Sequence, residues 1–220
     1  LLSLGGKRIR PLLALSVSNA EGSTSEAALP ASLAVELFHN FTLMHDDIMD
    51  NAPLRRGQQT VHEKFSENAA ILSGDALFTA AYQAVELASP DELPQLLKIL
   101  NKTSMEVCVG QQLDLDFESM DDVTEEMYLE MIRLKTSVLL AASCSMGAIC
   151  AGASQERVEA WYEFGEKLGL AFQIQDDYLD TFGDENATGK KVGGDILADK
   201  KTFLFIHALS AGELTSTDGS

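Results

Sequence analysis

This sequence is poor in several features by which common classes of protein are recognised. Its 220 residues include five prolines and three cysteines, and Cys108, Cys144 and Cys150 have neither C-x-x-C spacing nor the histidine neighbours of a metal site. No apolar run reaches the roughly 18 to 20 residues that span a membrane, and no signal peptide opens the chain. We therefore expect a soluble, cytoplasmic protein without stable membrane association, whose cysteines are buried, reduced thiols.

Basic residues are also scarce. Sixteen Lys and Arg stand against 34 Asp and Glu, which gives a formal net charge of −18. The phosphate backbone of a nucleic acid repels such a protein, so we expect no nucleic-acid partner. A small phosphate ligand would have to be bound locally, by clustered cations or by metal ions.

The length and the apolar content suit one helical domain. With 45% hydrophobic residues the chain can bury one substantial core, so we expect a single domain over residues 1–220. Apolar residues recur at intervals of three and four, as at Leu33 and Leu37, and hairpin patterns are missing. This predicts an all-α bundle of roughly seven helices. Because Leu1 is not Met and residues 211–220 fade into Ser, Thr and Gly, we expect a piece of a longer polypeptide.

The sharpest local feature is a triplet of carboxylates at the end of an apolar helical stripe. Asp46, Asp47 and Asp50 have i, i+1, i+4 spacing, which places Asp46 and Asp50 on one face of a helix. Carboxylates this close repel one another unless a cation lies between them, and hard oxygen ligands suit Mg²⁺. Taken alone, the triplet is equally compatible with a solvated helix face.

The same spacing recurs 130 residues later, at Asp176, Asp177 and Asp180, again after an apolar helical stripe. Chance does not readily produce two such triplets. In a bundle, two antiparallel helices that end at the same rim would turn both triplets toward one cavity. The repetition therefore predicts a magnesium site.

The positive charges cluster where a diphosphate would need them. Arg binds phosphate through two parallel N–H donors, and Lys acts as a point charge. The clustered cations are Lys7, Arg8, Arg10, Arg55, Arg56, Lys135, Lys190, Lys191, Lys200 and Lys201. For Arg8 we favour an ordinary surface position.

Together these residues resemble the motifs of the trans-isoprenyl diphosphate synthases, also called polyprenyl synthetases. Six motifs occur in the family's order: Gly5–Pro11, Asp46–Asp50, Arg55–Gly57, Gly110–Gln111 with Asp114, Lys135–Thr136 and Gln173–Asp180. The resemblance implies an isoprenoid-synthase-type helical bundle around a central cavity, a homodimer, and a magnesium-dependent prenyltransferase. Its substrates would be isopentenyl diphosphate and an allylic diphosphate. The family usually has further helices before the first motif and beyond residue 220, which do not appear in residues 1–220, as expected of a piece of a longer polypeptide.

The resemblance also implies roles for the carboxylates and for the polar residues between the triplets. About three Mg²⁺ ions, bound with the allylic diphosphate, would be held by Asp46, Asp50 and Asp176, with support from Asp47, Asp177 and Asp180. Gln173 and Thr136 would stabilise the developing allylic cation, and Asp114 would support a neighbouring ligand.

The cations divide between the two diphosphates. Those for the allylic diphosphate would be Arg55, Lys135, Lys190 and Lys200, with Lys191 as an alternative to Lys190. Those for isopentenyl diphosphate would be Lys7, Arg10 and Arg56, together with His39.

Product length would be set beneath the first triplet. Phe41 lies five residues before Asp46, about 7.5 Å along a helix, and Thr42 lies one turn before it. The family's determinants of product chain length occupy this region, so Phe41 resembles the residue that closes the floor of the elongation cavity and stops the growing prenyl chain. Because Thr42 is small and the triplet has no insertion, we favour geranylgeranyl diphosphate over farnesyl diphosphate as the product.

Two other interpretations remain open. A class I terpene cyclase shares the helical fold and the first triplet, but normally replaces the second with an Asn/Asp, Ser/Thr, Glu triad. A non-catalytic subunit of a partner synthase should have lost aspartates from one triplet. Both triplets are complete here, which favours the prenyltransferase.

Overall fold

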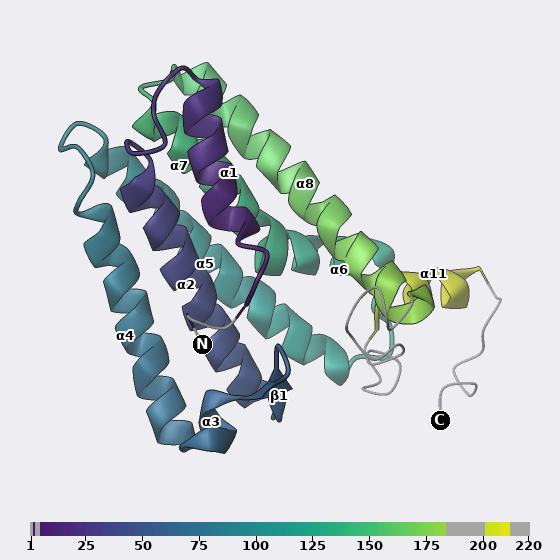
Figure 1. Ribbon diagram of the computed structural model, residues 1–220. Coiled ribbons are helices and arrows are strands. Elements are labelled where there is room, and N and C mark those ends of the chain that lie inside the picture. Colours follow the sequence, from purple (N-terminus) through teal and green to yellow (C-terminus); the bar gives the residue numbers. More distant parts are fainter. Residues whose placement is uncertain (1, 3–4, 184–200, 212–220) are drawn as a thin grey trace. The chain divides into compact units, whose positions relative to one another are not determined.

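A computed structural model describes residues 2, 5–183 and 201–211, which are almost entirely helical (Figure 1). The helices are α1 (Ile9–Ala20), α2 (Leu29–Met49), α3 (Val61–Lys64), α4 (Glu67–Val85), α5 (Leu93–Glu118), α6 (Glu125–Ile132), the π-helical turn η1 (Arg133–Ser137), α7 (Val138–Cys150), α8 (Gln155–Phe182) and α11 (Phe203–Ser210). In these residues the only strands are β1 (Leu54–Arg55) and β2 (Gln58–Gln59), which pair antiparallel. The predicted all-α class is confirmed.

The chain divides into two compact units. The first comprises residues 1–101 and 141–163, and the second comprises residues 102–140 and 164–220. The boundaries fall within α5, α7 and α8. The single domain expected over residues 1–220 stays a prediction.

In the first unit, α2 and α4 lie side by side (Figure 1). The buried face of α4 consists of small residues: Ala70, Gly74, Ala81, Ala84 and Val85. Small side chains let two helix axes approach closely, so the larger core residues of α2, such as Phe38 and Val35, can fill the space between them. The Ser66 hydroxyl caps the start of α4 by accepting the amide N–H of Ala69 at 3.1 Å.

The segment that follows α2 carries two left-handed residues other than glycine, one just after the helix and one in the turn between β1 and β2. Asn51 has φ of 48° and Arg56 has φ of 53°, and Gly57 follows with φ of 72°. Left-handed backbone is costly for residues other than glycine, and such strain is concentrated at functional sites. The Thr60 hydroxyl donates to the Ala52 carbonyl at 2.8 Å, which holds the turn against the end of α2.

In the second unit, α6, η1 and the start of α7 form one continuous helical segment. It contributes to a core cluster of buried residues: Phe117, Val123, Tyr128, Met131, Ile132 and Ile206. The expectation that no apolar run reaches membrane-spanning length was wrong for Glu125–Cys150, which is long and apolar enough, but 83% of its most apolar window is buried inside the protein. Its apolar character therefore serves the core.

The burial of the cysteines differs from the expectation at one position. Cys144 and Cys150 are buried, and burial raises the pKa of both thiols to about 12. The prediction that Cys108 is buried was wrong, because Cys108 lies on the exposed face of α5, next to the exposed Val109. Apolar neighbours in the sequence gave no sign that this face of the helix is uncovered.

Candidate active site

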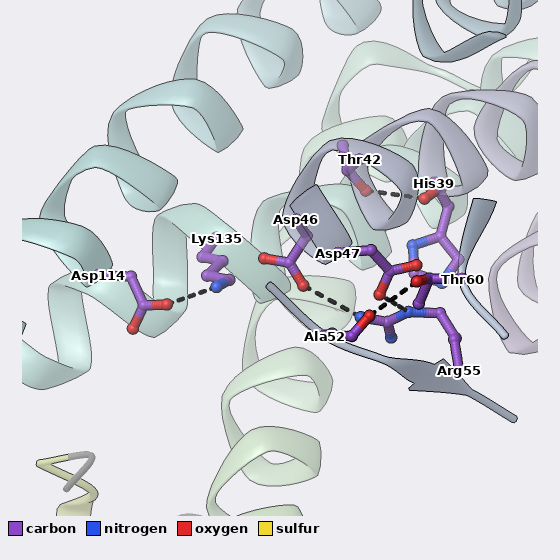
Figure 2. A network of polar contacts seen from close by, with 9 residues as sticks. All are labelled: His39, Thr42, Asp46, Asp47, Ala52, Arg55, Thr60, Asp114 and Lys135. Atoms are coloured by element: carbon purple, nitrogen blue, oxygen red, sulfur yellow. Dashed lines mark hydrogen bonds and ion pairs between the residues drawn. The ribbon is translucent and has the colours of Figure 1, made fainter. Parts of the chain in front are cut away.

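The first acidic triplet lies in the last turn of α2, where its three carboxylates have different surroundings. Asp47 is only 2% exposed, and Arg55 Nε donates to Asp47 Oδ1 at 2.5 Å. The same guanidinium lies 3.3 Å from Asp46 Oδ2, so Arg55 bridges both carboxylates (Figure 2). Burial raises the pKa of Asp47, and the Arg55 hydrogen bond opposes that rise. Asp50, one turn after Asp46, is exposed at the end of the helix.

The residues expected to bind the second diphosphate form a cationic group around His39. Arg10 Nη1 lies 3.2 Å from His39 Nε2, and since Arg is always a donor, Nε2 accepts. Burial, followed by the charges of Arg10, Arg56, Arg55 and Arg8, lowers the pKa of His39 to about 2. The imidazole is therefore neutral near pH 7 and carries its proton on Nδ1. Burial lowers the pKa of Arg10 to about 10, which leaves it a cation.

Arg56 joins this group by packing against the glycine motif. A Cβ atom on Gly6 would lie 3.0 Å from the Arg56 guanidinium carbon, so only glycine leaves the guanidinium its full space. Burial, with the charges of Arg8 and Arg55, lowers the pKa of Arg56. Lys7, the neighbour of Gly6, is exposed.

Arg8 departs from the ordinary surface position expected for it. Its side chain is 30% exposed and forms an ion pair with Glu36 of α2. Arg8 has φ of 50°, directly before the start of α1. Glu36, which sequence reasoning did not single out, also accepts a hydrogen bond from Asn40 Nδ2 at 3.0 Å, so it holds the glycine motif against α2.

In the second unit, the π-helical turn η1 carries the Lys135–Thr136 motif. The Val138 amide bonds to the Arg133 carbonyl, five residues back, instead of to the residue four back. One extra residue in the turn changes the direction of the side chains that follow it. Two glycines on neighbouring helices fit this bulge: a Cβ on Gly110 would clash with the Lys135 amide nitrogen, and one on Gly169 with the Ser137 backbone.

Lys135 pairs with Asp114, which lies one turn after Gly110 on α5. Lys135 Nζ donates to Asp114 Oδ2 at 2.5 Å (Figure 2). The two side chains are 24% and 21% exposed, so both can be reached by a ligand. Gly110 thus brings α5 close enough to η1 for Asp114 to orient the lysine.

A chain of hydrogen bonds joins Thr136 to the second acidic triplet. The Thr136 hydroxyl donates to Gln173 Oε1 at 3.1 Å, and Gln173 Nε2 donates to Asp177 Oδ1 at 3.0 Å. The hydroxyl of Tyr128 donates to Asp177 Oδ2 at 2.6 Å. Burial raises the pKa of Asp177, and its hydrogen bonds with Tyr128 and Gln173 oppose the rise.

These residues line one cavity of about 120 Å³ in the second unit. Lys135, Thr136, Gln173 and Asp177 contribute to its wall, together with Lys201. Lys201 Nζ donates to the Phe117 carbonyl at 3.0 Å. Lys190, Lys191 and Lys200 lie outside the described residues.

The two triplets share one pattern. In each, the middle carboxylate is 2% exposed and accepts protein donors, whereas the outer two are four residues apart on another face of the helix. Within residues 2, 5–183 and 201–211, no three His, Cys, Asp or Glu side chains gather into a complete metal site. The donor set still fits magnesium, which keeps several waters and takes phosphate oxygens as ligands.

Phe41 lies in a cluster of aromatic rings between α2 and α4. Its ring centroid is 5.4 Å from that of Phe38, 5.0 Å from that of Phe78 and 4.8 Å from that of His45. Sequence reasoning missed Phe78, because an apolar residue on α4 has no local signal that distinguishes it from core. The Thr42 hydroxyl donates to the His39 carbonyl at 2.8 Å.

Comparison with known proteins identifies the family. The sequence profile of the Polyprenyl synthetase family matches residues 1–217, so the chain belongs to that family. It is 49% identical over 210 residues to a short chain isoprenyl diphosphate synthase of Methanocaldococcus jannaschii, covering 95% of this chain and 64% of that protein. It is 45% identical to a geranylgeranyl diphosphate synthase of Methanosarcina mazei, covering 96% of this chain and 66% of that protein.

A solved structure shows the same fold. The crystal structure of a geranylgeranyl pyrophosphate synthase superposes with a TM-score of 0.93 at 52% sequence identity, over 96% of this chain and 65% of that one. The helices are therefore those of the isoprenoid synthase fold. The chain spans a little under two thirds of the length of these three proteins.

Proposed function

We propose that the protein is a magnesium-dependent prenyltransferase that condenses isopentenyl diphosphate with an allylic diphosphate. The product is a linear all-trans prenyl diphosphate, geranylgeranyl diphosphate in our proposal. The observation that carries this proposal is the cavity of the second unit, where Lys135, Thr136 and Gln173 lie together. A cation and two oxygen-bearing side chains at one cavity suit a reaction in which a diphosphate leaves and a carbocation develops.

The allylic diphosphate is activated by positive charge. Bound Mg²⁺, held by Asp46, Asp50 and Asp176, would neutralise the charge that grows on the diphosphate as its carbon–oxygen bond breaks. Lys135 supplies a fixed cation for the same purpose, since Asp114 holds its ammonium group at 2.5 Å. Arg55, which already contacts Asp46, supplies another cation beside the first triplet.

Thr136 and Gln173 stabilise the allylic cation that remains. Both residues line the cavity, and Gln173 Oε1 and the Thr136 hydroxyl oxygen carry partial negative charge. A preorganised dipole of this kind favours a developing positive charge without reorganising during the reaction.

The isopentenyl diphosphate is held by Arg10, Arg56 and His39, with Lys7 at the exposed edge of the group. Because His39 is neutral, it adds a hydrogen bond from Nδ1–H without adding a further charge to the arginines. The double bond of the substrate then attacks the allylic carbon, a new carbon–carbon bond forms, and a proton leaves to the released diphosphate. Holding both reactants aligned contributes about 7 to 11 kcal/mol in favourable cases.

Location in the cytoplasm and assembly as a homodimer belong to the same proposal. They are supported by the acidic composition, by the burial of the apolar segment Glu125–Cys150 and by the family resemblance. Size-exclusion chromatography with light scattering tests the dimer, and a monomer at assay concentration would contradict it.

The test is product chromatography after incubation with radiolabelled isopentenyl diphosphate, Mg²⁺ and one of three primers: dimethylallyl, geranyl or farnesyl diphosphate. We expect label in geranylgeranyl diphosphate, and none when a chelator replaces Mg²⁺. The length needs this experiment, since a relative from Natronomonas pharaonis at 40% identity is named geranylfarnesyl diphosphate synthase. Hydrocarbon formed from a primer alone would show a cyclase, and no turnover with any primer would contradict the proposed activity.

A further inference from the structure

Tyr128 is a buried tyrosine that none of the six sequence motifs contains. It lies in the first turn of α6 and is 5% exposed. Its hydroxyl donates to Asp177 Oδ2 at 2.6 Å, across 49 residues of sequence. Both groups line the same cavity as Thr136 and Gln173.

Asp177 collects three donors. Besides the Tyr128 hydroxyl, it accepts the Gln173 side-chain amide at 3.0 Å and the backbone N–H of Phe203 at the start of α11. An ionised carboxylate can only accept hydrogen bonds. The Gln173 amide turns its nitrogen toward Asp177 and its oxygen toward the Thr136 hydroxyl.

The orientation of Gln173 decides which charge it presents. With the nitrogen on Asp177, Oε1 accepts from the Thr136 hydroxyl at 3.1 Å, and both residues line the cavity. A flipped amide would instead direct its N–H donors, which carry partial positive charge, toward the developing cation. The orientation of this one amide thus determines whether Gln173 stabilises the developing cation or repels it.

We propose that Tyr128 is a positioning residue of the condensation reaction, and that it acts through Asp177 to fix the polarity of Gln173. The proposal rests on the prenyltransferase activity proposed above. Tyr128 donates to Oδ2 of Asp177, while Oδ1 accepts the Gln173 amide. Without the hydroxyl, Asp177 loses its donor at Oδ2, so the carboxylate is free to rotate and Gln173 loses its fixed partner.

The network has a second role that must be separated from the first. Asp177 joins α8 to Tyr128 of α6 and to the start of α11, so losing a donor could simply loosen the helices. A loss of packing would weaken the binding of every ligand. A loss of amide polarity would act on kcat and on the recognition of positive charge, and would spare KM.

The first test is the kinetics of Tyr128→Phe. We expect kcat to fall about tenfold to a hundredfold, as for other residues that orient a catalytic group, while KM for both substrates changes less than about twofold. Gln173→Ala should cost at least as much, and the double variant should be no slower than Gln173→Ala alone. Tyr162→Phe removes a hydroxyl from the first unit and should keep wild-type kcat. Wild-type kcat in Tyr128→Phe, or additive losses in the double variant, would overturn the proposal.

The second test reads binding instead of turnover. Calorimetry measures the binding of two prenyl diphosphate analogues. In one, an ammonium nitrogen replaces the carbon that becomes cationic; the other is its uncharged carbon isostere. Wild type should prefer the ammonium analogue, and Tyr128→Phe should lose about tenfold of that preference while it binds the isostere normally. Equal weakening of both analogues would show a structural role and sink the proposal.

A third variant keeps the test decisive if Tyr128→Phe does not fold. Tyr128→p-aminophenylalanine restores a donor at the same position and should recover most of kcat, whether Tyr128→Phe is slow or unfolded. If Tyr128→Phe folds, a p-aminophenylalanine variant that is equally slow would contradict the proposal. If Tyr128→Phe does not fold, the comparison is with Gln173→Ala, and a folded p-aminophenylalanine variant as slow as Gln173→Ala would contradict it. If wild type shows no turnover with isopentenyl diphosphate, the proposed activity itself is wrong. If wild type is active and Tyr128→Phe is equally active, only the positioning role of Tyr128 is wrong.

Discussion

Lys135 Nζ donates to Asp114 Oδ2 at 2.5 Å, and the contact depends on the absence of a side chain at Gly110, one turn before Asp114. The pair shows how the proposed catalytic cation is oriented by a residue on another helix. It also provides a test with a matched control on the same helix.

Asp114→Asn is expected to raise KM for the allylic diphosphate about threefold to tenfold, because the Lys135 ammonium loses the partner that orients it. Asp116 lies two residues further along α5, is exposed, and accepts a hydrogen bond from Gln112 Nε2 at 2.8 Å. Asp116→Asn should leave KM unchanged. Steady-state kinetics with varied allylic substrate distinguishes them, and equal effects in both variants would argue against the orienting role of Asp114.

Substitutions of two aspartates in the first triplet should affect stability and activity differently. Asp47 is buried against Arg55, so Asp47→Ala removes a charged hydrogen bond and is expected to cost about 1 to 3 kcal/mol of unfolding free energy. Asp50 is exposed, and Asp50→Ala should change the unfolding free energy by less than about 0.5 kcal/mol while it abolishes most turnover. Urea denaturation and the condensation assay check both. A stable, fully active Asp47→Ala would show that the contact with Arg55 contributes little.

The aromatic cluster predicts product length. Phe41→Ala removes a ring that contacts Phe38 and Phe78, and a longer chain can then extend into the space, since burial stabilises about 0.8 kcal/mol per methylene. Longer products should appear in the chromatogram. Thr42→Phe, which adds a ring one turn before Asp46, should shorten them. Unchanged length distributions in both variants would place the floor of the cavity elsewhere.

Phe78→Ala offers an independent test of the same wall from α4. Its ring contacts Phe38, Phe41 and Tyr82, so its loss also opens space between α2 and α4. We expect longer products than wild type, with the double variant Phe41→Ala/Phe78→Ala giving the longest. Chain-length analysis at matched turnover checks this order. A double variant that makes wild-type product would contradict the placement of the wall.

His39 predicts a pH dependence of stability. Its pKa is lowered to about 2 in the folded protein, against about 6.5 for an unperturbed histidine, so below pH 6.5 the unfolded state binds a proton that the folded state refuses. Stability therefore falls as pH drops from 6.5 toward 2, by up to about 1.4 kcal/mol per pH unit from this group. His39→Gln should lose that part of the slope. Parallel stability curves for the two proteins between pH 7 and pH 5 would rule out a buried, neutral His39.

Much of the fold and part of the site could be predicted because helical spacing is local. The repeat of three and four gave the all-α class, and the i, i+4 spacing placed Asp46 with Asp50 and Asp176 with Asp180 on shared faces. The cations at Arg10 and Arg56 were found by their clustering, and both lie with His39 in the structure.

The remainder depends on contacts between distant residues. The π-helical turn at Arg133–Ser137 has no signature of its own, because the glycines that fit it, Gly110 and Gly169, lie on other helices. Left-handed backbone at Arg8 and Arg56 is also invisible, since glycine is the usual signal for it. Tyr128 was missed because its hydroxyl acts on Asp177, 49 residues away.

The most direct test of the proposed activity is the rate of Asp176→Ala at saturating Mg²⁺, with isopentenyl diphosphate and an allylic primer. Asp176 precedes the buried Asp177 and is a proposed metal ligand, so its loss acts on the transition state. We expect helical circular dichroism and melting temperature close to wild type, with condensation reduced at least about a thousandfold. A folded Asp176→Ala that makes prenyl diphosphate at the wild-type rate would contradict the magnesium-dependent mechanism.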